Sequence, residues 1–138
     1  MAKIRLQILT ADRVVFSGDV DAIIVPGTEG QLGILPDHAP ILALLQGGEV
    51  TIRIGDEDYY LAISGGMLEM NSNNAIMLAY TAELAEEIDI TRAEAARIRS
   101  LDRLQHVTGE EDLARDEAAL RRALTRIKVA DRRKKKRV

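Results

Sequence analysis

The sequence predicts an antiparallel β-sandwich followed by a C-terminal two-helix antiparallel hairpin. Composition supports this prediction, because nine of the ten glycines, all three prolines, all three tyrosines and the single phenylalanine precede Glu83. The spacing of apolar residues also supports it, since they alternate in short runs before that point and recur at helical spacing after Ala93. Composition and spacing that change together indicate a domain boundary. We therefore predict a sandwich over residues 1–86, a helical hairpin over 87–133 and a basic tail over 134–138.

Size and composition limit the classes of protein that the chain can belong to. Its 138 residues allow one ordinary domain, or one small core with an appendage. It has no cysteine for disulfides or thiolate ligands, and its two histidines, His38 and His106, stand alone, so we expect no metal. No apolar run reaches the roughly 18 residues of a membrane span, so we expect a soluble protein without lipid insertion.

The first part of the chain is a series of short strand patterns separated by turn residues. Lys3 to Leu9 alternates strictly, with Ile4, Leu6 and Ile8 on one face. Further strands are expected at residues 14–17, 20–25, 41–45, 49–54, 59–64, 67–71 and 75–81. Short strands divided by glycine and asparagine turns are typical of an antiparallel sandwich and not of βαβ units.

Three glycines between Gly27 and Pro40 raise the possibility of a phosphate-binding loop. Such a loop leads into a helix whose N-terminus presents free N–H groups, whereas here a β run with two prolines follows. We interpret the glycines instead as a tight bend with close approach of neighbouring strands.

Two motifs in this part of the chain indicate a family. Residues 30–40 read Gly-Gln-Leu-Gly-Ile-Leu-Pro-Asp-His-Ala-Pro, and residues 64–69 read Ser-Gly-Gly-Met-Leu-Glu. Through them, residues 1–130 resemble the epsilon-subunit family of bacterial F-type ATP synthases. The resemblance implies an N-terminal sandwich of about ten strands, packed as two antiparallel sheets, and a C-terminal helical hairpin.

The resemblance also implies a function and partners. It implies a non-catalytic central-stalk (rotor) subunit, peripheral to the membrane at the cytoplasmic face of the cell inner membrane. The sandwich is then expected to dock on the gamma subunit and the c-subunit ring. The hairpin is expected either to fold against the sandwich or to extend along gamma into the alpha/beta catalytic hexamer, where it inhibits ATP hydrolysis.

Two helix starts are visible in the second part of the chain. Thr91 to Glu94 has the pattern of a capping box, although Asp89 is an alternative cap, and the helix is expected to reach about His106. Thr108 to Glu111 repeats the pattern and predicts a second helix to about Asp131. A short link between two helices predicts an antiparallel hairpin.

The predicted contact between these helices is thin. Its candidates are Ile90, Ala93, Ala96 and Leu104, or Ile98 and Leu101, on the first helix, and Leu113, Leu120, Leu124 and Ile127 on the second. Alanine buries little apolar area, so the contact exceeds the entropic cost of ordering by only a small margin. We expect a hairpin that opens readily or depends on another contact.

Arginines on both helices suggest an anion as that contact. Arg92 and Arg99 are seven residues apart and share a helix face, and Arg122 and Arg126 are four apart and share another. Glu117 lies four residues before Arg121 and Glu94 three before Arg97, which predicts ion pairs there, whereas Arg122 and Arg126 have no carboxylate at such a spacing. A solvated basic face, or pairing with acids of the sandwich, is the alternative.

The family resemblance favours the anion. Ile88-Asp89-Ile90-Thr91-Arg92-Ala93 is similar to the nucleotide-binding signature of the family. The positions that the resemblance implies for ATP binding are Glu83, Ile88, Asp89, Arg92, Ala93, Arg99, Arg122 and Arg126. Arginine offers paired donors to phosphate oxygens. Ser64 lies in no recognisable nucleophile motif and there is no Walker lysine, so we expect ATP to be a regulatory ligand, with no catalytic site and no cofactor.

The chain ends in a basic tail, Arg132-Arg133-Lys134-Lys135-Lys136-Arg137, that departs from the family pattern. Three interpretations are a disordered solubilising segment, a contact with an acidic surface of the catalytic subunits, and a nucleic-acid-binding segment. The rest of the chain is acidic and has no interleaved aromatic residues for base stacking, so we expect no nucleic acid.

Overall fold

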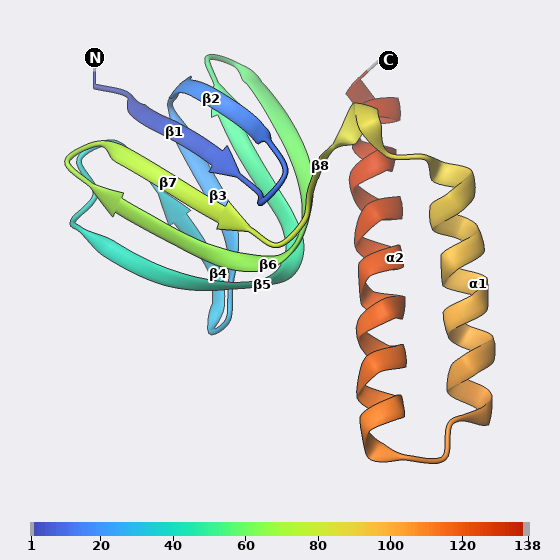
Figure 1. Cartoon of the computed structure of the whole chain (residues 1–138). Helices are drawn as coiled ribbons and strands as arrows, with labels where there is room; N and C mark the ends of the chain where they lie inside the picture. The colour runs from blue at the N-terminus through green and yellow to red at the C-terminus, as the bar shows by residue number, and fades with distance from the viewer. Residues whose placement is uncertain (1, 137–138) are drawn as a thin grey trace. The chain divides into compact units, whose positions relative to one another are not determined.

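The computed structural model describes residues 2–136, and side chains as far as residue 132. The chain divides into two compact units, Met1–Leu84 and Ala85–Val138. The first consists of strands and the second of helices (Figure 1). Each is described by itself below.

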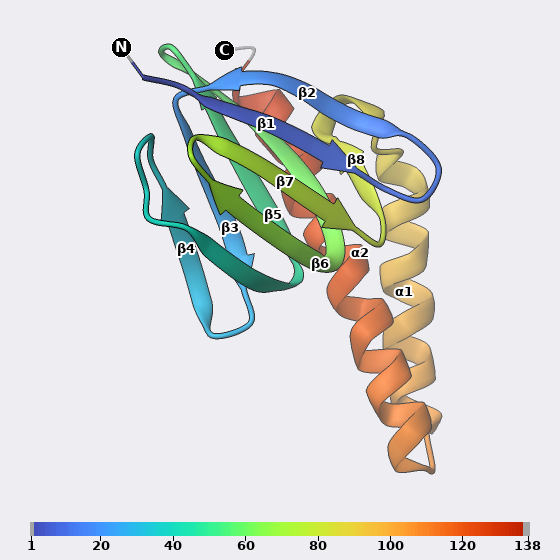
Figure 2. The same cartoon turned by 60° about the vertical axis from the view of Figure 1, so that its left-hand side comes forward.

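Eight strands form the N-terminal unit. They are β1 (Ile4–Leu9), β2 (Val14–Val20), β3 (Ala22–Gly27), β4 (Gly30–Ile34), β5 (Ile41–Ile54), β6 (Glu57–Asn71), β7 (Asn74–Ala79) and β8 (Ala82–Leu84). Their order is β2-β1-β7-β6-β5-β3-β4, with β8 also paired to β6. The β1–β7 pair is parallel and the other pairs are antiparallel. Figure 2 shows the sheet folded over into a sandwich.

The two layers exist because β5 and β6 each take part in both. Residues 66–71 of β6 pair with β7, whereas residues 61–63 pair with β8. The change of layer falls at Gly47 and Gly48 on β5 and at Gly65 and Gly66 on β6, where Leu45 is opposite Gly66 and Gln46 opposite Gly65. Gly65 and Gly66 have φ values of 125° and 154°. Residues with a Cβ atom avoid this positive-φ region. The glycine pairs therefore let two long strands bend between layers.

The predicted sandwich is confirmed, but the expected number of about ten strands is wrong. The breaks that we placed at the two glycine pairs are bends within β5 and β6, because the ladder continues through them. The bend expected between Gly27 and Pro40 contains an additional strand, β4, which pairs with β3 from Gly27↔Gly30 to Ile23↔Ile34. β8 is a further strand that we did not predict, because its three residues show no alternating pattern.

The sandwich core consists of aliphatic side chains from both layers. Ile4, Leu6 and Ile8 are completely buried, as their alternation predicts. They pack in one cluster with Val20, Ile23, Val25, Ile34, Val50, Ile52, Leu61, Leu68, Met70 and Met77. This single core is what makes the N-terminal unit compact.

The C-terminal unit comprises η1 (Ala85–Glu87), α1 (Ile90–His106) and α2 (Glu110–Lys136). Asp89, not Thr91, caps α1, because its Oδ1 accepts a hydrogen bond from the Arg92 N–H at 3.1 Å. Thr108 does not cap α2, whose first backbone bond, from Leu113 N–H, goes to Gly109 O. Neither helix of residues 2–136 is both long and apolar enough to cross a membrane.

Helix α2 is longer than predicted. It ends at Lys136 instead of near Asp131, and so takes in the first residues of the predicted tail. Arginine and lysine are good helix formers, and positive charge at a helix C-terminus interacts favourably with the helix dipole. Residues 137 and 138, and the side chains from residue 133 onward, lie outside the described part of the chain.

The contact line between α1 and α2 agrees with the predicted stripes in part: Ala93 is buried, and Ile90, Ala96, Leu104, Leu120 and Ile127 are half-buried. The residues buried along this line are small or polar, namely Ala93 and Ser100 on α1, and Asp116 and Ala123 on α2; Val129 and Ala130 are also buried, further along α2. The larger predicted candidates, Ile98, Leu101, Leu113 and Leu124, are 38–59% exposed. Small side chains let helix axes approach closely, and these four longer side chains lie outside the contact. We call the line through Ala93, Ser100, Asp116 and Ala123 the seam.

Replacement of Gly66 by alanine is expected to destabilise the sandwich by about 2 to 4 kcal/mol. A Cβ there would overlap the carbonyl oxygen of Leu78 and lie 2.9 Å from the Cα of Ala79. Gly33→Ala is the matched control, because nothing lies within 4 Å of its Cβ position. Urea unfolding of both variants measures the difference, and equal losses would contradict the role given to Gly66.

Candidate functional site

The predicted ATP-binding residues divide between the two units. Glu83 lies half-buried on β8, opposite Ala62 of β6, in the N-terminal unit. The other seven belong to the C-terminal unit: Ile88, Asp89, Arg92, Ala93, Arg99, Arg122 and Arg126. The arrangement of those seven can be followed within that unit alone.

The signature residues at the start of α1 have two kinds of role. Ile88 and Ala93 are buried, at 2% and 0% exposure, and so hold the helix start in place. Asp89 is exposed and caps the helix through Oδ1, while within residues 2–132 its Oδ2 forms no hydrogen bond. Arg92 is exposed. The cap therefore leaves one carboxylate oxygen and one guanidinium group accessible at the same helix end.

The four predicted arginines lie on one face of the hairpin. Taking about 100° per residue, Arg92 and Arg99 lie roughly 100° to 120° to one side of the seam on α1. On α2, Arg122 and Arg126 lie roughly 60° to 100° from the seam in the same rotational sense. In an antiparallel pair, offsets of the same sense fall on the same face. We call this the arginine face; Ile98, Leu101, Leu113 and Leu124 lie on the opposite one.

Three of the four arginines also lie at similar heights along the hairpin. Residues equally distant from the turn at Thr108 are level in an antiparallel pair, which places Arg92 between Arg122 and Arg126, within about 3 Å of each along the axis. Arg99 lies roughly 8 Å nearer the turn than Arg122. Both helices thus contribute positive charge to one elongated area.

These positive charges are largely unpaired. Within residues 2–132, the side chains of Arg92, Arg99 and Arg122 form no hydrogen bond or ion pair, and all three are exposed. The predicted pair of Arg97 with Glu94 is present at 3.0 Å. The predicted pair of Arg121 with Glu117 is absent among these residues, because two exposed side chains gain too little to be held together.

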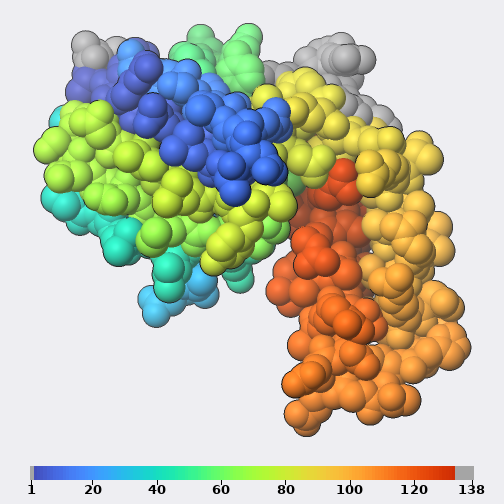
Figure 3. Space-filling view, in the orientation of Figure 1, coloured from blue at the N-terminus to red at the C-terminus, as the bar shows by residue number. Residues whose placement is uncertain are grey.

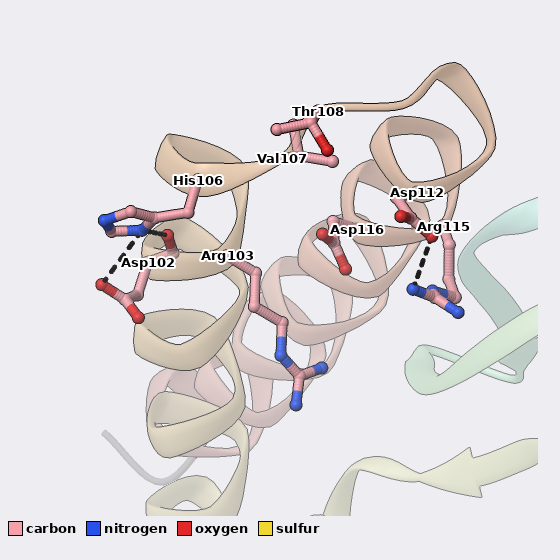
Figure 4. Close-up of a pocket in the computed structure, with 8 residues that line it drawn as sticks. All are labelled: Asp102, Arg103, His106, Val107, Thr108, Asp112, Arg115 and Asp116. Atoms are coloured by element: carbon pink, nitrogen blue, oxygen red, sulfur yellow. Dashed lines mark hydrogen bonds and ion pairs between the residues drawn. The ribbon is translucent and has the colours of Figure 1, made fainter.

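A second charged region lies at the turn end of the hairpin, which the sequence did not predict. Figure 4 shows a cavity of about 720 Å³ lined by Asp102, Arg103, His106, Val107, Thr108, Asp112, Arg115 and Asp116. Arg115 pairs with Asp112 at 2.8 Å, and His106 Nδ1 lies 3.9 Å from Asp102 Oδ1. Within residues 2–132, Arg103 and Asp116 have no partner. The sequence prediction missed this cavity because it placed leucines, and not Asp116, between the helices.

The outer surface of the sandwich carries an apolar row that was also not predicted. Cross-strand pairing places Leu44, Met67, Leu78, Leu9 and Val14 side by side over β5, β6, β7, β1 and β2. Leu44, Leu78 and Val14 are 62%, 47% and 60% exposed. Figure 3 shows β1, β2 and β7, in blue and yellow-green, on the near face. The sequence did contain a sign of this row, because residues 41–45 are apolar at positions that face both sides of the strand.

A cavity adjoins one end of the apolar row. It has a volume of about 420 Å³ and lies between the β3–β4 hairpin and the start of β5, with Leu44 among its lining residues. The loop that leads into β5 is held to the β6–β7 turn by two bonds: Asp37 N–H donates to Asn73 Oδ1 at 2.6 Å, and Asn73 Nδ2 donates to Asp37 Oδ1 at 2.9 Å. The loop containing the first motif is therefore fixed next to this surface.

Two family models together cover almost all of the chain. The model of the ATP synthase delta/epsilon chain β-sandwich domain matches residues 3–85, and the model of the long α-helix domain of the same chain matches residues 86–131. The chain belongs to the ATP synthase delta/epsilon chain family.

The relatives within this family are epsilon chains. The chain is 48% identical over 137 residues to the ATP synthase epsilon chain of Dehalococcoides mccartyi, covering 98% of this chain and 97% of the relative. It is 46% identical over 131 residues to that of Moorella thermoacetica, covering 94% and 98%. It is similar to a chain of the Euglena gracilis mitochondrial ATP synthase structure, with a TM-score of 0.78, 25% identity and coverage of 88% and 77%. The resemblance inferred from the two motifs is thus confirmed.

Proposed function

We propose that the protein is the non-catalytic central-stalk (rotor) subunit of a proton-translocating F-type ATP synthase, peripheral to the membrane at its cytoplasmic face. In this role it couples the alpha/beta catalytic hexamer to the c-subunit ring. Its C-terminal hairpin inhibits ATP hydrolysis when extended, and ATP binding stabilises the compact hairpin. Membership of the epsilon-chain family supports the subunit assignment, and the arginine face supports the role of ATP.

The arginine face is the observation on which the ATP site depends. A triphosphate presents several negative oxygens over a length that spans Arg92, Arg99 and Arg122, and each guanidinium offers paired donors to such oxygens. Like charges on one face repel each other, so an unliganded arginine face disfavours closure while a bound polyanion favours it. Because the arginines come from both helices, the anion is held best when the helices lie side by side.

The remaining predicted residues fit the less charged part of a nucleotide. Asp89 Oδ2 is open to accept a hydrogen bond from a ribose hydroxyl or from the adenine amino group. We assign Glu83 a contact of the same kind. Ile88 and Ala93 contribute indirectly, because their burial fixes the orientation of the helix start that carries Asp89 and Arg92.

The seam explains why a ligand of ordinary affinity is sufficient for regulation. Two alanines, a serine and an aspartate are the buried residues of the seam, and the larger Leu104, Leu120 and Ile127 are only half-buried, so we infer that the compact hairpin is only slightly stable. A ligand that binds only the compact state stabilises it by RT ln(1 + [ATP]/Kd), which is about 1.4 kcal/mol at ten times Kd. That amount shifts a nearly balanced equilibrium, so the extended inhibitory form accumulates when ATP is scarce.

The apolar row is the surface that fits the docking role of the sandwich. A contiguous exposed apolar strip across five strands is unusual for a surface that faces only water. We assign it to the gamma subunit, and the adjoining β3–β4 end to the stalk contacts that include the c-subunit ring. Both assignments are proposals for this chain, and its family membership supports them.

Replacement of Arg122 by alanine is expected to weaken ATP binding at least tenfold, since a hydrogen bond to a charged group contributes about 1.5 to 3 kcal/mol. Arg126→Ala is expected to act similarly. Arg121→Ala is the matched control, because Arg121 is exposed and unpaired within residues 2–132 but points away from the arginine face. Isothermal titration calorimetry measures all three. Equal losses at the three positions would indicate diffuse basic attraction instead of a site.

ATP is expected to compact the hairpin. Because the chain has no cysteine, Thr91→Cys and Lys128→Cys place two fluorophores at exposed positions near the open end of the two helices. Energy transfer between them should rise with ATP, rise less with ADP, and fail to rise in Arg126→Ala. In the assembled complex, inhibition of hydrolysis should increase as ATP falls. If energy transfer between the fluorophores does not change with ATP while calorimetry shows binding, the protein has a nucleotide site but no switch.

Disruption of the apolar row is expected to weaken binding to the gamma subunit. Leu44→Asp or Leu78→Asp places a charge in an apolar contact, and each should raise the Kd for gamma at least tenfold, consistent with a desolvation cost of about 1 to 3 kcal/mol. Leu35→Asp, an equally exposed aliphatic position of the sandwich outside the apolar row, is the control. Surface-based binding measurements with purified gamma give the constants. If both Leu44→Asp and Leu78→Asp bind gamma with unchanged Kd, the apolar row is not part of the interface with gamma.

A further inference from the structure

Glu69 is an exposed acidic residue on the outer surface of the sandwich, next to the apolar row. Cross-strand pairing places it between Leu42 of β5 and Ile76 of β7, which are 65% and 41% exposed. The preceding side chain on this face of β6 is Met67, which belongs to the apolar row. A single carboxylate therefore lies among aliphatic side chains on three sides.

The rest of the described chain does not compensate the charge of Glu69. Within residues 2–132 its carboxylate forms no hydrogen bond and no ion pair. Arg5 lies on the same face, opposite Asn74 of β7. Its guanidinium, however, pairs with Asp19 at 3.6 Å and donates a hydrogen bond to Ser17 at 3.4 Å. Water is therefore what stabilises the Glu69 carboxylate in the free subunit.

A partner that docks on the apolar row must also cover Glu69. The row crosses five strands at a spacing of about 4.8 Å and is one side chain wide, so it covers on the order of 150 Å². A stable protein–protein contact covers about 800 Å² on each partner. The contact must therefore extend to the neighbouring row, in which Leu42 and Ile76 flank Glu69 on both sides.

A covered carboxylate needs a partner of opposite charge. A charge that loses water without gaining such a partner raises the free energy of the complex. A lysine or arginine offers charge-assisted hydrogen bonds that offset this cost. Apolar contact is non-directional, so the leucines of the row do not by themselves fix the position of a partner. One charge pair at a defined place within the contact does fix it.

We infer that the gamma surface that covers the apolar row carries a lysine or arginine opposite Glu69, and that this ion pair fixes the position of gamma on the sandwich. The inference rests on the proposed docking of this face on gamma. The competing role for Glu69 is to keep the apolar face of the free subunit soluble, as charges on exposed sheets do. The two roles predict different binding behaviour.

The test compares Glu69→Gln with Asp56→Asn in the full chain. Each variant removes one negative charge from an exposed position of the sandwich and keeps the shape of the side chain. Asp56 lies in the turn between β5 and β6, away from the apolar row, and within residues 2–132 it also forms no hydrogen bond or ion pair. Glu69→Lys and Asp56→Lys repeat the comparison with the charge reversed. Urea unfolding checks that all four variants remain folded.

Binding kinetics with purified gamma measure the effect. We expect Glu69→Gln to raise the dissociation rate constant at least tenfold and to change the association rate constant less than threefold, because losing one partner of a covered ion pair acts on dissociation. Glu69→Lys should weaken binding further, and the Asp56 variants should change the Kd less than threefold.

Two results would overturn the inference. An effect confined to the association rate constant, or equal effects at Glu69 and Asp56, would show long-range attraction between the subunits and no ion pair. Unchanged or tighter binding of gamma by Glu69→Gln, together with increased self-association of the free subunit, would show that Glu69 only keeps the face soluble.

Failure of the inference and failure of the proposed docking give different results. If Leu44→Asp and Leu78→Asp weaken binding to gamma but Glu69→Gln does not, the face is the interface and no cation lies opposite Glu69. If none of the three variants changes the Kd, docking through this face fails and the ion pair fails with it. If both hold, replacement of the partner cation on gamma by glutamate should restore the affinity of Glu69→Lys and so identify that cation.

Discussion

The contact of α1 with α2 through small side chains is the constraint on which the behaviour of the C-terminal unit depends. Ala93 and Ala123 contribute one methyl group each to the seam, and Ser100 and Asp116 contribute polar atoms. The helices can therefore lie close together while burying little apolar area. Close approach also brings the arginines of both helices onto one surface, so the small seam and the proposed anion site have the same structural origin.

The N-terminal unit is built in the opposite way. Its aliphatic core is completely buried, and two long strands bind its layers into one hydrogen-bonded sheet. The bend in those strands requires glycine, because the backbone of β7 passes where a side chain of β6 would stand. A stable unit suits a fixed attachment, and a marginal unit suits a part that changes state. In the function that we propose, the two units thus separate docking from sensing.

Much of the fold follows from local patterns that act over a few residues. The alternation of Ile4, Leu6 and Ile8, the two helices and the end of α1 at His106 were predicted because period 2 and period 3.6 reflect burial directly. The continuity of β5 and β6 was not predicted, since a glycine pair at a bend has the same local sequence as a glycine pair at a turn. Which partner strand continues past the glycines is decided by distant residues.

The candidate site shows the same limit. Arginine spacing predicted shared faces on each helix, but the relation of the two faces depends on which residues form the seam. Hydrophobicity favoured four residues of α2, of which Leu120 and Ile127 are half-buried while Leu113 and Leu124 are exposed. The buried positions of α2 at the seam are Ala123 and Asp116. Only with that seam does the sense of rotation place Arg92 and Arg99 on the same side as Arg122 and Arg126. The ion pair of Arg121 with Glu117 failed because sequence spacing permits such a pair without making it stable.

In the function that we propose, two opposing contributions meet in the helical unit, and their balance lets one bound anion change its state. Packing at the seam favours closure weakly, because the buried area is small. Repulsion along the arginine face opposes closure, and it does so through solvent, which keeps it modest. In that proposal, a polyanion on the arginine face reverses the sign of the second contribution without altering the first, so the ligand acts on the part of the balance that is exposed to the solution.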